Sequence, residues 1–234
     1  MELSQHELEM IRQYRLANNN TKSAVECLLS VKNQNKSRQT DNMKYYNTNN
    51  IYKSAMQVLV DYNITTLPIK VTDIIKQTNI KLLNNSDCNF LKSNQLGICI
   101  FIDNEWYIIV NDTMKIERIR FTIAHELGHI FLGHRLQYSD KEDKNGKPIT
   151  EITADIFATL LLAPPCLIQG LGLKEIDDIS RVFNIEFDAN CFDDIRPYII
   201  DYNKNNFLET EFEKKVYSNF KNYIETFNYN NKAI

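Results

Sequence analysis

The sequence predicts an α+β domain that is mostly helical, with a small antiparallel sheet packed beside one histidine-rich helix. Two β-rich runs, GICIFID and EWYIIVN, are separated by little more than Asp103-Asn104, which favours a hairpin. Several longer segments have apolar residues at helical spacing. The stretch FTIAHELGHIFLGH, residues 121–134, contains three of the chain's four histidines. These observations place the histidines on a helix next to the sheet.

The composition is that of a globular protein and excludes several functions. Apolar residues make up 43% of the 234 residues and charged residues 24%, and the net charge of -3 favours neither nucleic acid nor an anionic membrane. The five cysteines include no C-x-x-C pair, so no thiolate metal site is predicted. The longest apolar run, IFATLLLAPPCLI, is broken by Pro164-Pro165 and is too short to span a bilayer. We expect a cytoplasmic protein without a membrane segment.

Residues 1–50 are predicted to form a helical extension and a linker. Weak helical spacing covers residues 2–16 and about 21–32, and a stretch rich in Asn, Lys, Ser and Thr follows. Two helices could form a DNA-binding helix-turn-helix, but seven Lys/Arg against five Asp/Glu make direct nucleic-acid binding unfavourable. The domain prediction is therefore an extension over 1–50, a central domain over 51–200 that holds the histidine-rich helix, and a helical tail over 201–234.

The elements of the central domain follow from its apolar spacing. A helix is expected over 51–62, and residues 67–80 begin extended and continue as a second helix. After the hairpin, the histidine-rich helix spans about 115–134. A polar loop leads to the helix EITADIFATLLLA, which the two prolines end. Short helices are predicted at 173–183 and 187–199. A last amphipathic helix is predicted from Phe207, Phe212, Val216, Phe220, Ile224 and Phe227.

The motif His125-Glu126-x-x-His129 predicts a metal centre. A spacing of four places the two imidazoles on one helix face about 6 Å apart, close enough to bind one zinc ion. Glu126 lies about 100° further round the helix, where it can serve as a general base. The alternative is a buried polar pair on a core helix. Such a pair would leave polar groups unsatisfied on a very apolar helix, at a cost of about 1–3 kcal/mol, so we favour the metal.

Glu151 is the preferred third ligand. It begins the next helix, on which Ala154 and Ala158 would permit a close approach to the histidine helix. Asp155, one turn further, is placed to accept the N–H of a ligating histidine. The alternative for this pair of carboxylates is a solvated acidic helix face. His134 follows His129 by five positions, whereas a third histidine ligand is expected at six, so His134 is interpreted as a helix-end residue or as a group that polarises substrate.

The motifs RIRFTIAHELGHIFLGH and EITADIFATLLLAPP resemble the ImmA/IrrE family of metallo-endopeptidases, over about residues 51–198. The resemblance implies a zincin-like core with one zinc ion per chain on His125, His129 and Glu151, and Glu126 as the base. It also implies a protein substrate, a separate transcriptional repressor of the helix-turn-helix type, in a phage, mobile-element or stress-response setting. Residues 1–50 and those after 200 have no counterpart in this resemblance.

Two functions therefore compete. The first is a zinc-dependent endopeptidase, in which the strand 105–110 would be the sheet edge that pairs with extended substrate. The oxyanion-stabilising group is left open among Tyr138, His134 and Arg118. The second is a zinc-scaffolded binding protein that controls a repressor without cleaving it. The intact Glu126 favours the enzyme, because a structural site has no use for a base beside the metal.

Overall fold

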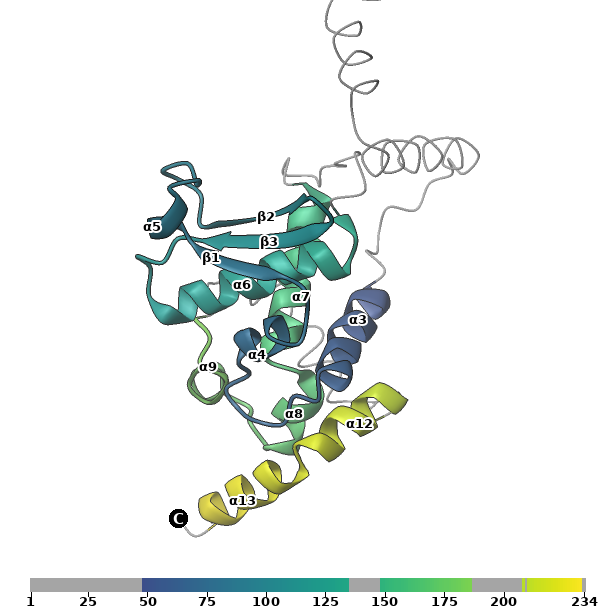
Figure 1. Cartoon of the computed structure of the whole chain (residues 1–234). Coiled ribbons are helices and arrows are strands. Elements are labelled where there is room, and N and C mark those ends of the chain that lie inside the picture. The colour runs from purple at the N-terminus through teal and green to yellow at the C-terminus, as the bar shows by residue number, and fades with distance from the viewer. Residues whose placement is uncertain (1–47, 135–147, 187–207, 209, 233–234) are drawn as a thin grey trace, which may run out of the picture. The chain divides into compact units, whose positions relative to one another are not determined.

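A computed structural model describes residues 48–134, 148–186, 208 and 210–232, shown in colour in Figure 1. These residues form helices and one small sheet, so the predicted α+β class is confirmed. The helices predicted within residues 1–47 lie outside the described residues. So do most of the polar loop before Glu151 and the helix predicted at 187–199.

The first described helix, α3 (Thr48–Asp61), confirms the prediction for residues 51–62. Ala55, Met56 and Leu59 are completely buried on the face that packs against the helix α7 (Ile149–Leu162). After α3 the chain is irregular, and it forms the short helix α4 (Val71–Ile75) within the segment predicted to become helical. The apolar side chains of α4 complete this part of the core.

The sheet has three strands, β1 (Lys81–Asn84), β2 (Gly97–Ile102) and β3 (Glu105–Val110). Strands β2 and β3 form the predicted antiparallel hairpin, and Asp103 and Asn104 at its turn have φ values of 51° and 66°. Both residues are thus in the left-handed region, as a tight two-residue turn requires, and Asp and Asn tolerate this conformation.

The strand β1 was not predicted, and it changes two expectations about the sheet. It pairs with β3 in parallel, with Leu82 opposite Ile108, so the sheet is mixed rather than antiparallel. The strand order is β1-β3-β2. The interpretation of β3 as the sheet edge is therefore wrong: β3 is hydrogen-bonded on both sides, and β2 is an outer strand of the sheet that the structure describes.

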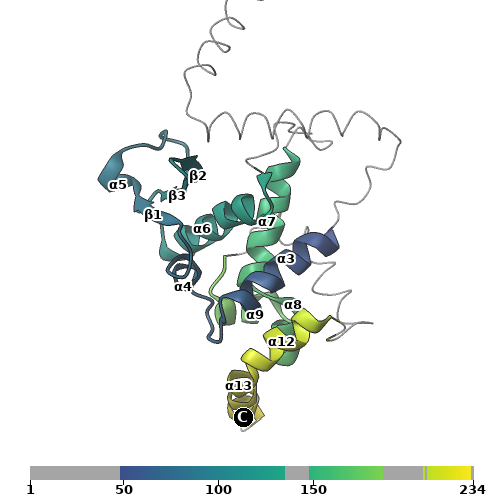
Figure 2. The same ribbon diagram turned by 45° about the vertical axis from the view of Figure 1, so that its right-hand side comes forward.

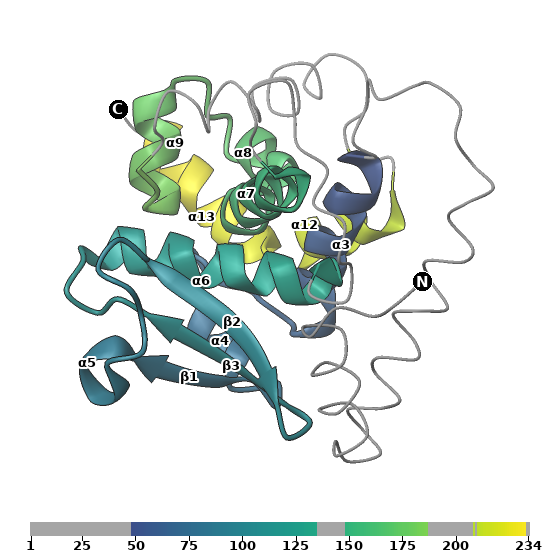
Figure 3. The ribbon, with the colours of Figure 1, turned by 90° about the horizontal axis from the view of Figure 1, so that it is seen from above.

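The helix α6 (Ile116–Phe131) runs along one face of the sheet and contacts β2 and β3, while α7 packs on the side of α6 away from the sheet (Figure 3). Figure 2 shows α7 between α6 and α3. The predicted end of α7 is confirmed, because the chain leaves helical geometry at Ala163 and Pro164-Pro165 begin the next helix, α8 (Pro165–Gly170). The short helices α5 (Asn85–Cys88) and α9 (Ile176–Phe183) complete this part of the chain.

The most apolar segment forms the centre of the domain. Residues Ile149–Gly170 have the length and composition of a membrane-spanning helix, but 89% of their apolar window is buried inside the protein. Phe157, Leu160 and Leu161 are almost completely inaccessible to solvent. This burial is typical of a core helix that is surrounded by other helices, because such a helix has apolar residues on every side.

The last amphipathic segment forms two helices, α12 (Glu211–Asn219) and α13 (Lys221–Lys232), rather than the single helix predicted. The buried Phe220 separates them, with backbone angles outside the helical range. α12 begins with a capping box between Thr210 and Glu213, and it packs against α3 and α8. The buried Glu213 accepts a hydrogen bond of 2.5 Å from Tyr52 of α3, which connects the two helices.

Candidate metal centre

The helices α6 and α7 approach each other closely where glycine and alanine face each other. A Cβ atom on Gly128 would lie 3.2 Å from the Cα and the carbonyl oxygen of Ala154, and 3.1 Å from the ring of Phe157. Glycine inside a helix is less stable than alanine by about 1 kcal/mol. The close approach explains why glycine is present here, because a Cβ atom would crowd its neighbours. It allows side chains from both helices to meet in one place.

Three side chains meet there, and they form the group of possible metal ligands found among the described residues. The Nε2 atoms of His125 and His129 are 3.0 Å apart. One oxygen of Glu151 lies 3.3 Å from Nε2 of His125, and the other lies 3.4 Å from Nε2 of His129. The spacing of four along α6 thus places both imidazoles on the side that α7 covers, and the first turn of α7 supplies the carboxylate.

These separations fit a small tetrahedral cation. Ligand bonds of roughly 2.0–2.1 Å at tetrahedral angles place the ligand atoms about 3.3 Å from one another. The separation of the two nitrogens, and that of each nitrogen from one of the two Glu151 oxygens, is within 0.3 Å of this value. Two nitrogen lone pairs and a carboxylate at such distances repel one another unless a cation or a proton lies between them. The arrangement can therefore bind a metal ion with three protein ligands.

Asp155 holds the ring of His125. Its Oδ1 atom lies 2.8 Å from Nδ1 of His125, so Nδ1–H donates to the carboxylate and Nε2 faces His129 and Glu151. Burial lowers the pKa of His125, but hydrogen bonds with Asp155 and Glu151 outweigh burial and raise this pKa to about 9. The metal-free ring therefore carries a second proton at neutral pH, and a metal ion that binds here displaces it.

His134 lies against the other histidine. Its Nδ1 atom is 3.1 Å from Nδ1 of His129, and the two rings meet edge to face. α6 ends at Phe131, so His134 is beyond the helix rather than in its last turn. The structure gives it a partner within the cluster, which the interpretation as a helix-end residue did not anticipate.

Glu126 is buried, with 7% of its surface exposed, beside the ligand cluster and under the strand β2. Burial raises the pKa of its carboxyl group, whereas His125 and hydrogen bonds from the backbone and thiol of Cys99 lower it, with a net increase. Gly97 of β2 lies next to this carboxylate, and a Cβ there would lie only 2.5 Å from the Thr122 methyl group, so glycine is what lets the strand pack this closely on α6. Because its pKa is raised, the Glu126 carboxylate is a stronger base than an exposed glutamate, and it lies next to the ligand cluster.

Gly97, Cys99 and Thr153 were not predicted as neighbours of the site. Gly97 and Cys99 are two positions apart on β2 and share one face of the strand, so a strand with that face toward α6 could have indicated them. Thr153 precedes Ala154 on α7, and its position depends on the rotation of that helix. Tyr138, a candidate for stabilising the oxyanion, lies outside the described residues.

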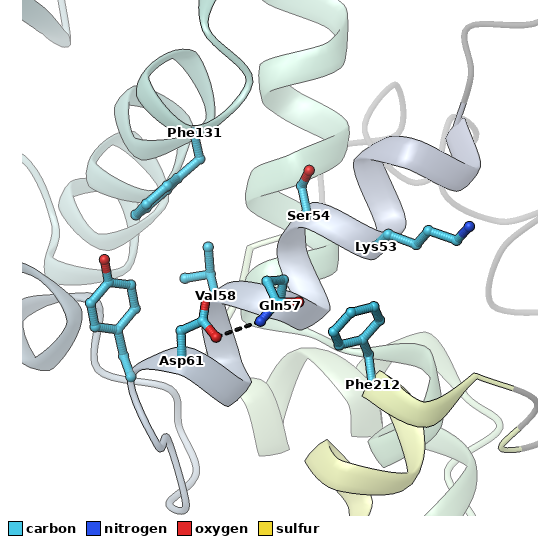
Figure 4. A pocket seen from close by; sticks show the side chains of 8 residues that line it. Lys53, Ser54, Gln57, Val58, Asp61, Phe131 and Phe212 are labelled. Atoms are coloured by element: carbon cyan, nitrogen blue, oxygen red, sulfur yellow. Dashed lines mark hydrogen bonds between the residues drawn. The ribbon is translucent and has the colours of Figure 1, made fainter.

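A separate pocket of about 340 Å³ lies beside α3 (Figure 4). Phe131 from α6 and Phe212 from α12 form apolar parts of its wall. Its polar lining comes from α3, where Gln57 donates a hydrogen bond to Asp61. None of the lining residues belongs to the ligand cluster, so this pocket is not the candidate metal centre.

The fold and the cluster together define a metallopeptidase-type domain, with two histidines from one helix and a glutamate from the next. Residues 85–191 match the family model Peptidase_M78, described as the IrrE N-terminal-like domain. This match covers the hairpin and the helices α6 and α7, and it confirms the resemblance to ImmA/IrrE metallopeptidases. This part of the chain therefore resembles an IrrE N-terminal-like domain. No curated protein matches the chain.

Proposed function

We propose that the protein is a zinc-dependent endopeptidase that hydrolyses a peptide bond in a partner protein. One observation carries the proposal: two imidazole nitrogens and the Glu151 carboxylate converge on one place, and the buried carboxylate of Glu126 lies beside them. Two histidines and one glutamate leave a coordination position open on zinc, which is the arrangement of a catalytic site rather than a structural one.

Each residue of the cluster has a role in this mechanism. His125, His129 and Glu151 hold the zinc ion, and Asp155 keeps Nε2 of His125 directed at it. When bound, zinc polarises the scissile carbonyl group and lowers the pKa of water, so that water can lose a proton and act as a nucleophile near neutral pH. Glu126 takes a proton from the attacking water and passes it to the nitrogen of the leaving amine. Its raised pKa favours the first of these transfers, because it makes the carboxylate a stronger base.

The substrate is proposed to bind as an extended strand along β2. Among the described strands, β2 pairs only with β3, which leaves its other edge available for hydrogen bonds to a peptide. Cys99 of the same strand contacts the carboxylate of Glu126. A peptide paired with β2 would therefore pass close to the general base.

A separate helix-turn-helix repressor is the proposed substrate, on the strength of the family resemblance. This substrate implies action in the cytoplasm and recognition of a protein rather than nucleic acid. The net charge of -3 agrees with a chain that does not bind DNA by itself. The proposed domain limits remain 1–50, 51–200 and 201–234.

The substitution Glu126→Gln separates an enzyme from a scaffold that binds zinc and a repressor without cleavage. Glutamine keeps the shape of the side chain but cannot take the proton, so cleavage should fall by about 10²–10⁴-fold. Zinc content should remain near one ion per chain, because Glu126 is not a ligand. The integrity of the repressor and its release from DNA are followed with parent and variant. Equal relief of repression by both proteins, with the repressor intact, would establish the scaffold and exclude the enzyme.

A further inference from the structure

His134 reaches the ligand cluster through a turn that follows α6. Gly133 has a φ of +70°, a left-handed conformation that glycine adopts without strain, and its N–H donates to the carbonyl of Ile130. This turn directs the chain back toward the helix, so the ring of His134 lies beside that of His129. A residue with a Cβ atom at position 133 would be strained in this conformation.

The hydrogen bonds around His134 favour one arrangement of the protons. The hydroxyl of Thr153 donates to carbonyl groups of its own helix, at 2.9 Å from Ile149 and 3.2 Å from Thr150. With its single proton used there, its oxygen is left to accept a hydrogen bond from Nε2–H of His134, 3.2 Å away. The neutral ring of His134 then has a lone pair on Nδ1, which accepts from Nδ1–H of His129 at 3.1 Å.

We propose that His134 and Thr153 are positioning residues that hold His129 in the tautomer required for metal binding. With Nδ1 protonated, the lone pair of His129 is on Nε2, the atom that faces His125 and Glu151. The chain of hydrogen bonds also fixes the rotation of the ring. This inference rests on the proposed metal site and adds two residues to it, one of them from α7.

The two ligating histidines are thus held in different ways. Asp155 accepts from His125 with a carboxylate, whereas His129 donates to a neutral imidazole that is itself held by a hydroxyl group. Outer partners of metal-binding histidines typically change metal affinity by 10–100-fold when removed. The hydroxyl of Thr153 acts through His134, so its removal should have a smaller effect than removal of the ring.

The matched variants Thr153→Val and Thr153→Ser of the full-length protein test the hydrogen bonds from Thr153 through His134 to His129. Valine keeps the shape but removes the hydroxyl, and we expect zinc affinity, measured by competition with a chelator, to fall about 3–10-fold. Serine keeps the hydroxyl and should return the affinity to within about twofold of the parent. Equal zinc affinities of the valine variant, the serine variant and the parent would show that Thr153 does not help to position His129.

His134→Ala tests the step next to the ligand, and we expect zinc affinity to fall about 10–100-fold. The second measurement is the ¹⁵N chemical shifts of the His129 ring in metal-free protein. We expect Nδ1–H in the parent and a mixture of tautomers in His134→Ala. Unchanged affinity together with an unchanged tautomer in the variant would overturn the inference. Failure of the parent to bind zinc would instead refute the proposed function, and the ring spectra would still decide the hydrogen-bond chain.

Discussion

Two clusters of buried polar side chains link helices in this protein, and they differ in how their hydrogen bonds are completed. Between α3 and α12, Glu213 accepts from the hydroxyl of Tyr52 at 2.5 Å and from the backbone N–H of Thr210 at 2.8 Å. Between α6 and α7, Nε2 atoms of His125 and His129 face each other at 3.0 Å. The first cluster contains a donor for each carboxylate oxygen. The second directs two imidazoles and the Glu151 carboxylate at a common point, where the second proton of His125 is the cation that a metal ion would displace.

This difference separates a structural role from a ligand-binding role. A buried cluster that supplies its own donors stabilises the helix contact and needs nothing else. Burial raises the pKa of the Tyr52 hydroxyl, as do Cys166 and Glu213, so Tyr52 remains a donor at any ordinary pH. A buried cluster of converging acceptors is unfavourable until a cation binds, and it can therefore couple metal binding to the stability of the fold.

The largest expected effect comes from removing a ligand of the α6–α7 cluster. Glu151→Ala deletes both oxygens that face the histidines, so the purified protein should retain little zinc, as should His129→Ala. Elemental analysis measures the metal content directly, with Glu225→Ala on the exposed face of α13 as the control. A Glu151→Ala protein that keeps one zinc ion per chain would show that the third ligand is another residue.

A smaller effect is expected from opening the α3–α12 cluster. Tyr52→Phe removes the donor to the buried Glu213, and the loss of a hydrogen bond to a charged group should lower the free energy of unfolding by about 1.5–3 kcal/mol. Urea denaturation measures this change, and Tyr229→Phe, at a tyrosine that is 78% exposed, serves as the control. Zinc content should be unaffected. Loss of metal in Tyr52→Phe would mean that the two clusters are not independent.

The smallest effect is expected at an exposed pair of charges. Lys115 lies 3.2 Å from Glu186, and their side chains are 75% and 58% exposed. Water screens such pairs, so Lys115→Ala should change the free energy of unfolding by less than about 0.5 kcal/mol and leave zinc content unchanged. The same urea titration provides the measurement. A larger loss would show that burial is not what distinguishes the two clusters from other polar contacts.

Local patterns in the sequence were sufficient for most of the described elements. Apolar spacing predicted α3, α6, α7 and α9, and the pair Asp103-Asn104 predicted the hairpin turn. The strand β1 was missed because four residues, KLLN, contain too little periodicity to distinguish a strand from an irregular segment. The prediction that β3 lies at the sheet edge was also wrong, since pairing between β1 and β3 depends on contacts between residues far apart in the chain.

The candidate metal centre also combines features that the sequence alone determines with features that only the tertiary structure decides. The spacing of His125, Glu126 and His129 determined by itself which side chains share a face of α6, because the helical repeat fixes the direction of each residue. Only the tertiary structure decided that Cys99 contacts Glu126 and that His134 contacts both His129 and Thr153. These contacts join a strand, a turn and a second helix, whose relative positions follow from core packing and from the left-handed turn at Gly133, and no local sequence pattern specifies them.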